Sequence, residues 1–259
     1  MKQKYKIAFA MLFVVLIALI VFNIFFHDEK LRVLKEYSPE GKLLGTNEYI
    51  IRNGDTILQG KFINYNEKGI KISEGQFIDN EPKGICSYYY DNGKIKSVYY
   101  KKNSKVDLEA TYYNKEGLIR KYVMCNDFSE PKFIIEFDEK TVKMYDGYAT
   151  YPVNQYKIER GKKYKINIQD TLKVGDVIKY DYLLANIPNT KRTFKIATEG
   201  IENSTVKRTI TYKEPTRIVV EEVLTKRGLN RIKAITQYIF NDKATLVKND
   251  TISFDINVN

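Results

Sequence analysis

Histidine is scarce in this chain of 259 residues, which has one, and there are two cysteines and no tryptophan. The single histidine, His27, leaves a Ser-His-Asp or Cys-His arrangement without a base anywhere else in the chain. Cys86 and Cys125 stand alone, so no cluster has the spacing of a zinc site. There is no Gly-rich phosphate loop, and Asp79-Asn80-Glu81 lacks the alternating spacing of a calcium loop. We therefore expect no catalytic, metal or cofactor site, and we predict that the protein is not an enzyme.

Adjacent carboxylates are the remaining candidates for acid–base chemistry. Glu221 and Glu222 follow each other in a segment with strand character, so their side chains should point to opposite faces. A hydrolase that uses carboxylates stays open as an alternative, with these two residues as its best candidates.

Dense runs of positive charge are also missing, although the net charge is +11. Residues 27–145 hold 20 Lys and Arg against 19 Asp and Glu, whereas residues 146–259 hold 20 against 13. A basic domain attracts anionic lipid, acidic polymers or nucleic acid. Acids are scattered among the bases, however, and no Lys/Arg run exceeds three residues. We expect no nucleic-acid partner.

A long apolar run stands near the N-terminus. Residues 7–26 read IAFAMLFVVLIALIVFNIFF, with no charge and one amide, Asn23. About 20 apolar residues suffice to cross a bilayer as a helix. The bulky residues at the end of the run argue against cleavage as a secretory signal. No cysteine precedes Cys86, which excludes a lipoprotein signal. The run therefore predicts a single-pass signal anchor.

Flanking charge suggests how such an anchor is oriented. Lys2, Lys4 and Lys6 precede it, whereas the cations that follow are diluted by acids. The positive-inside bias favours a cytoplasmic tail over residues 1–6. Residues 27–36 would form a linker, and the rest of the chain would lie outside the cytoplasm, attached to the cytoplasmic membrane.

Turn signals recur over the next ninety residues. Four segments align: Tyr37-Ser-Pro-Glu-Gly41, Tyr65-Asn-Glu-Lys-Gly69, Tyr90-Asp-Asn-Gly93 and Tyr113-Asn-Lys-Glu-Gly117. Between them lie an Asn-Gly hairpin signal at Gly54, a Pro-containing turn at Gly84 and a slot without glycine at residues 102–105. The residues between the turns alternate as strands do. We predict an array of stacked hairpins over residues 37–126.

These turns, together with Glu74-Gly-Gln-Phe77 and Lys83-Gly-Ile85, resemble the bacterial variant of the MORN repeat, often labelled antitoxin-like, over residues 37–122. The resemblance implies an extended β surface used for contacts. The array departs from the pattern at residues 102–105, which lack glycine, and in its degenerate first repeat.

Tyrosine pairs mark the candidate binding residues. Neighbours on a strand face opposite sides, so each adjacent pair should place one ring in the core and one outside. The outward rings form a possible contact strip for a glycan or peptide, for which we name Tyr88, Tyr90, Tyr99 and Tyr112. The alternative is cross-strand packing on a thin sheet.

The cysteines leave a further choice open. Outside the cytoplasm Cys86 and Cys125 are able to pair, unless their Cα atoms lie too far apart. The alternative is two small buried side chains.

The C-terminal third has longer strands. Residues 127–155 are expected to be a transition, and seven strand-like segments between residues 156 and 259 fit a β-sandwich. Ile252, Phe254, Ile256 and Val258 alternate with polar residues, which predicts one buried and one wet face. Residues 228–240 loosely resemble late strands of immunoglobulin-like modules. The expected fold is all-β, with one transmembrane helix, a repetitive β-meander and a β-sandwich.

The sequence combines a signal anchor with an array of hairpins and has no recognisable set of catalytic residues. Together these features predict a membrane-anchored binding or scaffold protein. Its partner would be a protein or a cell-envelope polymer. The alternative function is an antitoxin or immunity protein whose array masks a toxin.

Overall fold

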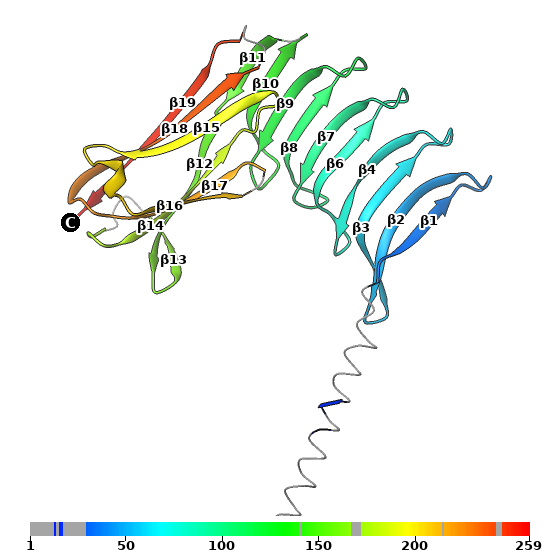
Figure 1. Ribbon diagram of the computed structural model, residues 1–259, viewed down its shortest axis with the longest axis horizontal. Coiled ribbons are helices and arrows are strands. Elements are labelled where there is room, and N and C mark those ends of the chain that lie inside the picture. Colours follow the sequence, from blue (N-terminus) through cyan, green and yellow to red (C-terminus); the bar gives the residue numbers. More distant parts are fainter. Residues whose placement is uncertain are drawn as a thin grey trace, which may run out of the picture. The chain divides into compact units, whose positions relative to one another are not determined.

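The computed structural model describes residues 13, 16, 17, 30–139, 141–166, 172–213, 215–241 and 245–259 (Figure 1). From residue 30 onward these residues form antiparallel β-strands joined by turns and one short 3-10 helix, Asn203–Thr205. The all-β prediction is therefore confirmed. The chain divides into two compact units, one ending at Gly93 and one beginning at Lys94, which are described separately below.

The predicted anchor at residues 7–26 lies outside the described residues except for Phe13, Leu16 and Ile17, which are helical. The predicted tail at residues 1–6 also lies outside them, as do His27 and the first part of the linker. Within the described part of the chain, no helix has the length and apolar character needed to cross a membrane.

The first unit is a ladder of strands in sequence order. Its members are β1 (Arg32–Tyr37), β2 (Leu43–Arg52), β3 (Asp55–Tyr65), β4 (Lys71–Ile78), β5 (Glu81–Pro82) and β6 (Gly84–Tyr89). The antiparallel pairs are β1 with β2, β2 with β3, β3 with β4, and β4 with β6, and the short β5 also pairs with β4.

Several turns of the array share one construction. In the turn after β3, the Asn66 side-chain oxygen accepts hydrogen bonds from the backbone N–H groups of Lys68 and Ile70, and Gly69 follows with a φ of 74°. An Asx side chain that bonds ahead in this way fixes the bend, and glycine adopts the left-handed conformation without steric cost. All six glycines proposed as repeat turns have positive φ: Gly41, Gly54, Gly69, Gly84, Gly93 and Gly117. In the slot without glycine, Asn103 accepts from the N–H groups of Lys105 and Val106.

The second unit begins with the same kind of ladder. β7 (Ile95–Lys101), β8 (Asp107–Tyr113), β9 (Ile119–Cys125), β10 (Pro131–Asp138) and β11 (Thr141–Gly147) pair consecutively and antiparallel. β10 and β11 occupy much of the stretch 127–155 that we expected to be a transition. The Asn126 turn explains this, because its side chain accepts from the N–H groups of Phe128 and Glu130 and returns the chain along β9.

Two further sheets complete the second unit. One has the order β13 (Lys162–Lys165), β12 (Thr150–Glu159), β14 (Val177–Leu184), β17 (Arg217–Val223) and β16 (Arg208–Lys213). The other has the order β15 (Thr190–Thr198), β18 (Gly228–Phe240) and β19 (Lys248–Val258). They share a core that includes Ile178, Tyr180, Ile218, Ile232 and Ile256. β19 alternates between more buried and exposed residues, as its sequence predicts.

The two sheets with their shared core are called the C-terminal body below. A second core joins this C-terminal body to the ladder. From β9 and β10 it takes Tyr122, Met124, Phe133, Ile135 and Phe137, and from the rest of the unit Ala149, Leu183, Ala185, Ile187, Tyr238 and Phe240. Burial of one large apolar side chain contributes about 1.5–3 kcal/mol. This core covers one face of β9 and β10. The opposite face of the ladder is not part of it.

Candidate functional site

The uncovered face of the ladder in the second unit carries a groove of about 490 Å³. Its floor follows from strand register. Tyr99 lies opposite Ala110, Ala110 opposite Val123, and Val123 opposite Ile134, so four strands contribute one side chain each to a single row. In the next row Tyr112 lies opposite Lys121. Ala110 is the smallest side chain of the first row, and the groove lies where it leaves room.

Tyr99 and Tyr112 form the aromatic wall of the groove. Their rings meet edge to face, with centroids 5.9 Å apart and planes at 81°. Their hydroxyl oxygens are 3.3 Å apart, within hydrogen-bond distance. Burial, and then the hydrogen bond to Tyr99, raise the pKa of Tyr112, which keeps its hydroxyl neutral. The pair offers an apolar surface with a polar tip, a combination suited to binding.

The other end of the groove is lined by Cys125, Asp107, Ser129 and Pro131. Burial raises the pKa of the Cys125 thiol to about 11, and the nearby Asp107 carboxylate adds to this shift. The thiol therefore stays protonated at neutral pH and contributes apolar surface rather than a nucleophile. Asp107 is paired with Lys101 at 2.7 Å. Cys86 and Cys125 do not form a disulfide with each other, and both are buried.

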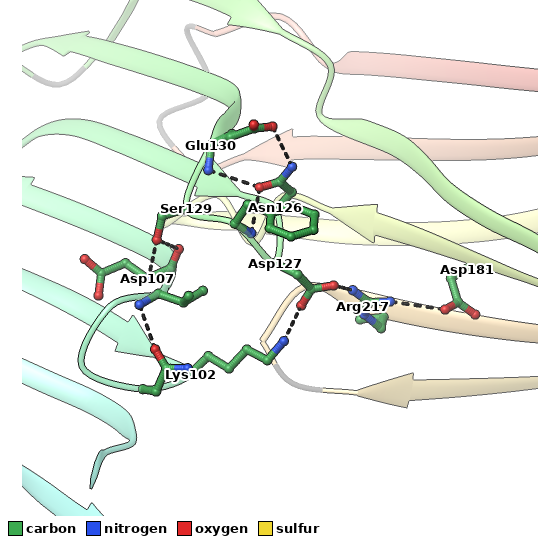
Figure 2. A network of polar contacts seen from close by, with 11 residues as sticks. Lys102, Asp107, Asn126, Asp127, Ser129, Glu130, Asp181 and Arg217 are labelled. Carbon is green, nitrogen blue, oxygen red and sulfur yellow. Dashed lines mark hydrogen bonds and ion pairs between the residues drawn. The ribbon is translucent and has the colours of Figure 1, made fainter.

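A polar network holds the loop beside this end in place (Figure 2). Lys102 Nζ lies 3.0 Å from Asp127 Oδ1, and the other oxygen of Asp127 accepts from Arg217. Arg217 also donates to Asp181 Oδ2 at 3.1 Å. Burial opposes ionisation of Asp127, but Lys102 and Arg217 outweigh it, so the pKa of that carboxyl lies below its usual range. Asp127 thus joins the β7–β8 turn to β17.

Ser129 ties the same loop to β8. Its hydroxyl oxygen accepts from the backbone N–H of Asp107 at 2.8 Å, and its hydroxyl lies 3.3 Å from the carbonyl oxygen of Lys105 (Figure 2). Because the loop is held from two sides, contacts within the fold itself fix the shape of the groove. A preformed site avoids the cost of ordering side chains on binding.

The four predicted binding tyrosines divide between the two units. Tyr99 and Tyr112 come together in the groove. Tyr88, on β6, is 36% exposed, and Tyr90 follows that strand; both belong to the first unit. Tyr89 belongs to the other face of β6, where its hydroxyl donates to Glu74 and Lys71 lies over its ring at 4.2 Å.

Sequence reasoning missed most of the groove. One signal could have found Val123 and Cys125: residues 122–125 are a continuous apolar run, which is typical of a strand buried on both faces. Ile134 lies in the stretch expected to be a transition. Its contribution depends on the register between β9 and β10, which no local pattern in the sequence specifies.

The carboxylates considered for catalysis are engaged in ion pairs. Glu222 is buried, 2.8 Å from Arg208 Nη2, and accepts from the hydroxyl groups of Tyr180 and Thr198. Glu221 points to the opposite face and pairs with Lys179. Among the described residues, no three His, Cys, Asp or Glu side chains are grouped as a metal site requires.

Two comparisons with known proteins identified no relative. Neither a scan against protein-family models nor a search of curated proteins found a match.

Proposed function

We propose that this chain is a binding protein without catalytic activity, held in the cytoplasmic membrane by residues 7–26 with its β units outside the cytoplasm. On this proposal the ladders are MORN-like hairpin arrays and residues 156–259 belong to an immunoglobulin-like sandwich. The groove on β7–β10 receives an apolar or aromatic side chain of a partner protein.

The observation that carries the proposal is the groove itself. Tyr99, Tyr112, Val123, Cys125 and Ile134 offer aromatic and aliphatic surface on a face of the ladder that the C-terminal body does not cover. Binding sites of this kind combine apolar lining with a few placed polar groups. Here Lys121 and Asp107 supply one charge of each sign among the lining residues.

The engagement of the carboxylates favours binding over hydrolysis. A general acid or base needs access to its substrate and a free proton site. Glu222 is 3% exposed and is surrounded by its own donors. Glu221 is held by Lys179 on a different face.

Photocrosslinking in the host cell tests the proposal. The full chain carries a photoreactive phenylalanine at Tyr112 in one sample, and at Tyr212 in a matched control. Tyr212 is a 62% exposed tyrosine of β16 outside the groove. We expect one protein to be trapped from position 112 and not from position 212. Identical products from both positions would contradict a groove-specific partner.

Affinity measurement with the trapped partner completes the test. Tyr112→Ala removes half of the aromatic wall, and truncation of an aromatic contact of this kind costs about 2 kcal/mol or more, which is roughly a 30-fold loss of affinity. Tyr212→Ala should bind like the wild-type chain. Unchanged affinity of Tyr112→Ala would refute the assignment of the groove.

A further inference from the structure

The hairpin formed by the end of β12 and by β13 differs from the rest of the second unit. β13 is an edge strand, and all four of its residues are exposed. β12 pairs with β14 only as far as Ile158, so the turn beyond it has β13 as its sole strand partner. The hairpin projects from the five-stranded sheet (Figure 1).

Positive charge is concentrated on this hairpin. Between Tyr156 and Lys165 there are five basic residues and one acid, Glu159. Lys157 is paired with Asp176 at 2.9 Å. Within the part of the chain that the structure describes, the other four have no carboxylate partner: Arg160, Lys162, Lys163 and Lys165.

Several cations elsewhere in this unit are balanced by ion pairs within the fold. On the three-stranded sheet Arg231 pairs with Asp255, and Lys233 pairs with Glu199. On the five-stranded sheet Lys179 pairs with Glu221. The hairpin differs in density, because its four cations without a carboxylate partner all lie between Arg160 and Lys165 on one projecting turn and edge strand.

The turn between β12 and β13 adds to this concentration of positive charge. Arg160 and Gly161 both have positive φ, 49° and 76°, the conformation of a type I′ turn. Asn, Asp or Gly normally occupies the first of these positions, because a longer side chain is disfavoured in the left-handed region. Here Arg160 places a cation at the tip of the hairpin, although its side chain disfavours the left-handed conformation.

Cations also lie on both faces of the hairpin. Lys163 and Lys165 lie opposite Ile158 and Tyr156, whereas Lys162 lies on the other face with Tyr164. Tyr164 is 49% exposed. Cations around a tip, joined by an exposed tyrosine, suit an approach to an anionic plane, since tyrosine sits well at the boundary between headgroups and acyl chains.

We propose that the β12–β13 hairpin docks on a membrane surface by binding the phosphate groups of anionic phospholipids. Lys162, Lys163 and Lys165 contribute the attraction together with Arg160, and Tyr164 inserts at the headgroup level. Each basic residue near such a surface strengthens binding about fivefold. The contact is independent of the groove and does not require its partner.

The missing tryptophan makes a clean assay possible. The full chain has no Trp, so Tyr164→Trp supplies a sole fluorescent reporter at the hairpin. The protein is reconstituted in phosphatidylcholine vesicles with or without about 30% phosphatidylglycerol. We expect a blue shift and quenching by brominated acyl chains only in the anionic vesicles, and reversal of both at high salt. Equal signals in both vesicle types would overturn the proposal.

Charge variants locate the contact. In the Tyr164→Trp chain, Lys162→Gln/Lys163→Gln/Lys165→Gln should shift the docking equilibrium about 100-fold toward the undocked state. The matched control removes the same charge elsewhere on the exposed surface of the unit, by Lys191→Gln/Lys195→Gln/Lys226→Gln. The control should keep the blue shift. Equal losses in both triple variants would show an effect of net charge alone and refute a hairpin site.

A soluble polyanion separates lipid from polymer. Poly(glycerol phosphate) is added to the reporter chain in phosphatidylcholine vesicles. We expect no quenching by brominated lipid under these conditions. A spectral shift with the polymer but none with phosphatidylglycerol vesicles would identify an envelope polymer as the ligand and overturn the membrane assignment.

Discussion

Glu109 offers the sharpest test of how the ladder and the C-terminal body are joined. This carboxylate of β8 is buried and accepts a hydrogen bond from the Tyr122 hydroxyl at 2.8 Å. The Tyr122 oxygen also accepts from the backbone N–H of Asn186. Burial raises the pKa of Glu109 from 4.5 to about 7, against the opposing effects of Tyr122, Arg192 and Asn186.

The sign of the pH dependence follows from that direction. Because the pKa is higher in the folded state, the folded chain binds more protons than the unfolded chain between about pH 4.5 and 7. Stability therefore falls as pH rises through this window, and the loss is complete above it. At 1.36 kcal/mol per pKa unit, the full effect is about 3 kcal/mol.

Glu109→Gln removes the titration and keeps an oxygen that accepts from Tyr122. We expect the variant to match the wild-type chain within about 1 kcal/mol at pH 4.5 and to exceed its stability by about 3 kcal/mol at pH 8. The assay is urea unfolding of the full chain in neutral detergent, with hydrogen exchange of the β8 and β9 amides as a local readout. Glu116→Gln, in an exposed turn of the same ladder, is the control, and it should leave the pH dependence of the unfolding free energy unchanged. The reasoning would be refuted if the difference in unfolding free energy between the wild-type chain and the variant did not change with pH. It would also be refuted if the wild-type chain were the more stable one at high pH.

Three further outcomes are expected. Gly117→Ala should cost about 1 kcal/mol in urea unfolding, because φ is +91° there while an added Cβ meets no atom within 4 Å; no loss would mean that the turn relaxes freely. Arg208→Met should cost about 3–5 kcal/mol, because it leaves the Glu222 carboxylate buried without its cation. Adding Glu222→Gln should recover part of that loss, and failure to do so would contradict the charge argument. In a Cys86→Ala chain, Cys125 should react with a disulfide reagent at pH 8 at least about 100-fold more slowly than free cysteine, and a fast reaction would contradict its burial.

Local signals in the sequence predicted the local structure. Asn66 and Gly69 specify their turn by side-chain bonding and by φ, and neither needs a distant partner. The alternation of Ile252, Phe254, Ile256 and Val258 identified a strand with one buried face, because strand geometry is independent of what covers that face.

Long-range features were beyond such reasoning. The contact of Asp127 with Arg217 joins positions 90 residues apart, and the hydroxyl of Tyr122 meets Asn186 across 64. Tyr99 and Tyr112 were named from their adjacency to other tyrosines, but the groove beside them also needs Ala110, Val123 and Ile134. These three meet only once the register of three strand pairs is fixed. A one-residue slip in any pair would turn one of them to the other face.

The covered face of β9 and β10 has a consequence for how this chain can change over evolutionary time. Tyr122, Met124 and Phe133 commit one face of β9 and β10 to the core shared with the C-terminal body, so a hairpin inserted between these strands would disrupt that core. Among the described residues, strands β1 to β6 contribute nothing to that core, and turns such as those at Gly54 and Gly69 carry their own Asn and Gly residues. Gene duplication can therefore lengthen the array on its N-terminal side while the tyrosine groove, built from β7 to β10, is inherited intact.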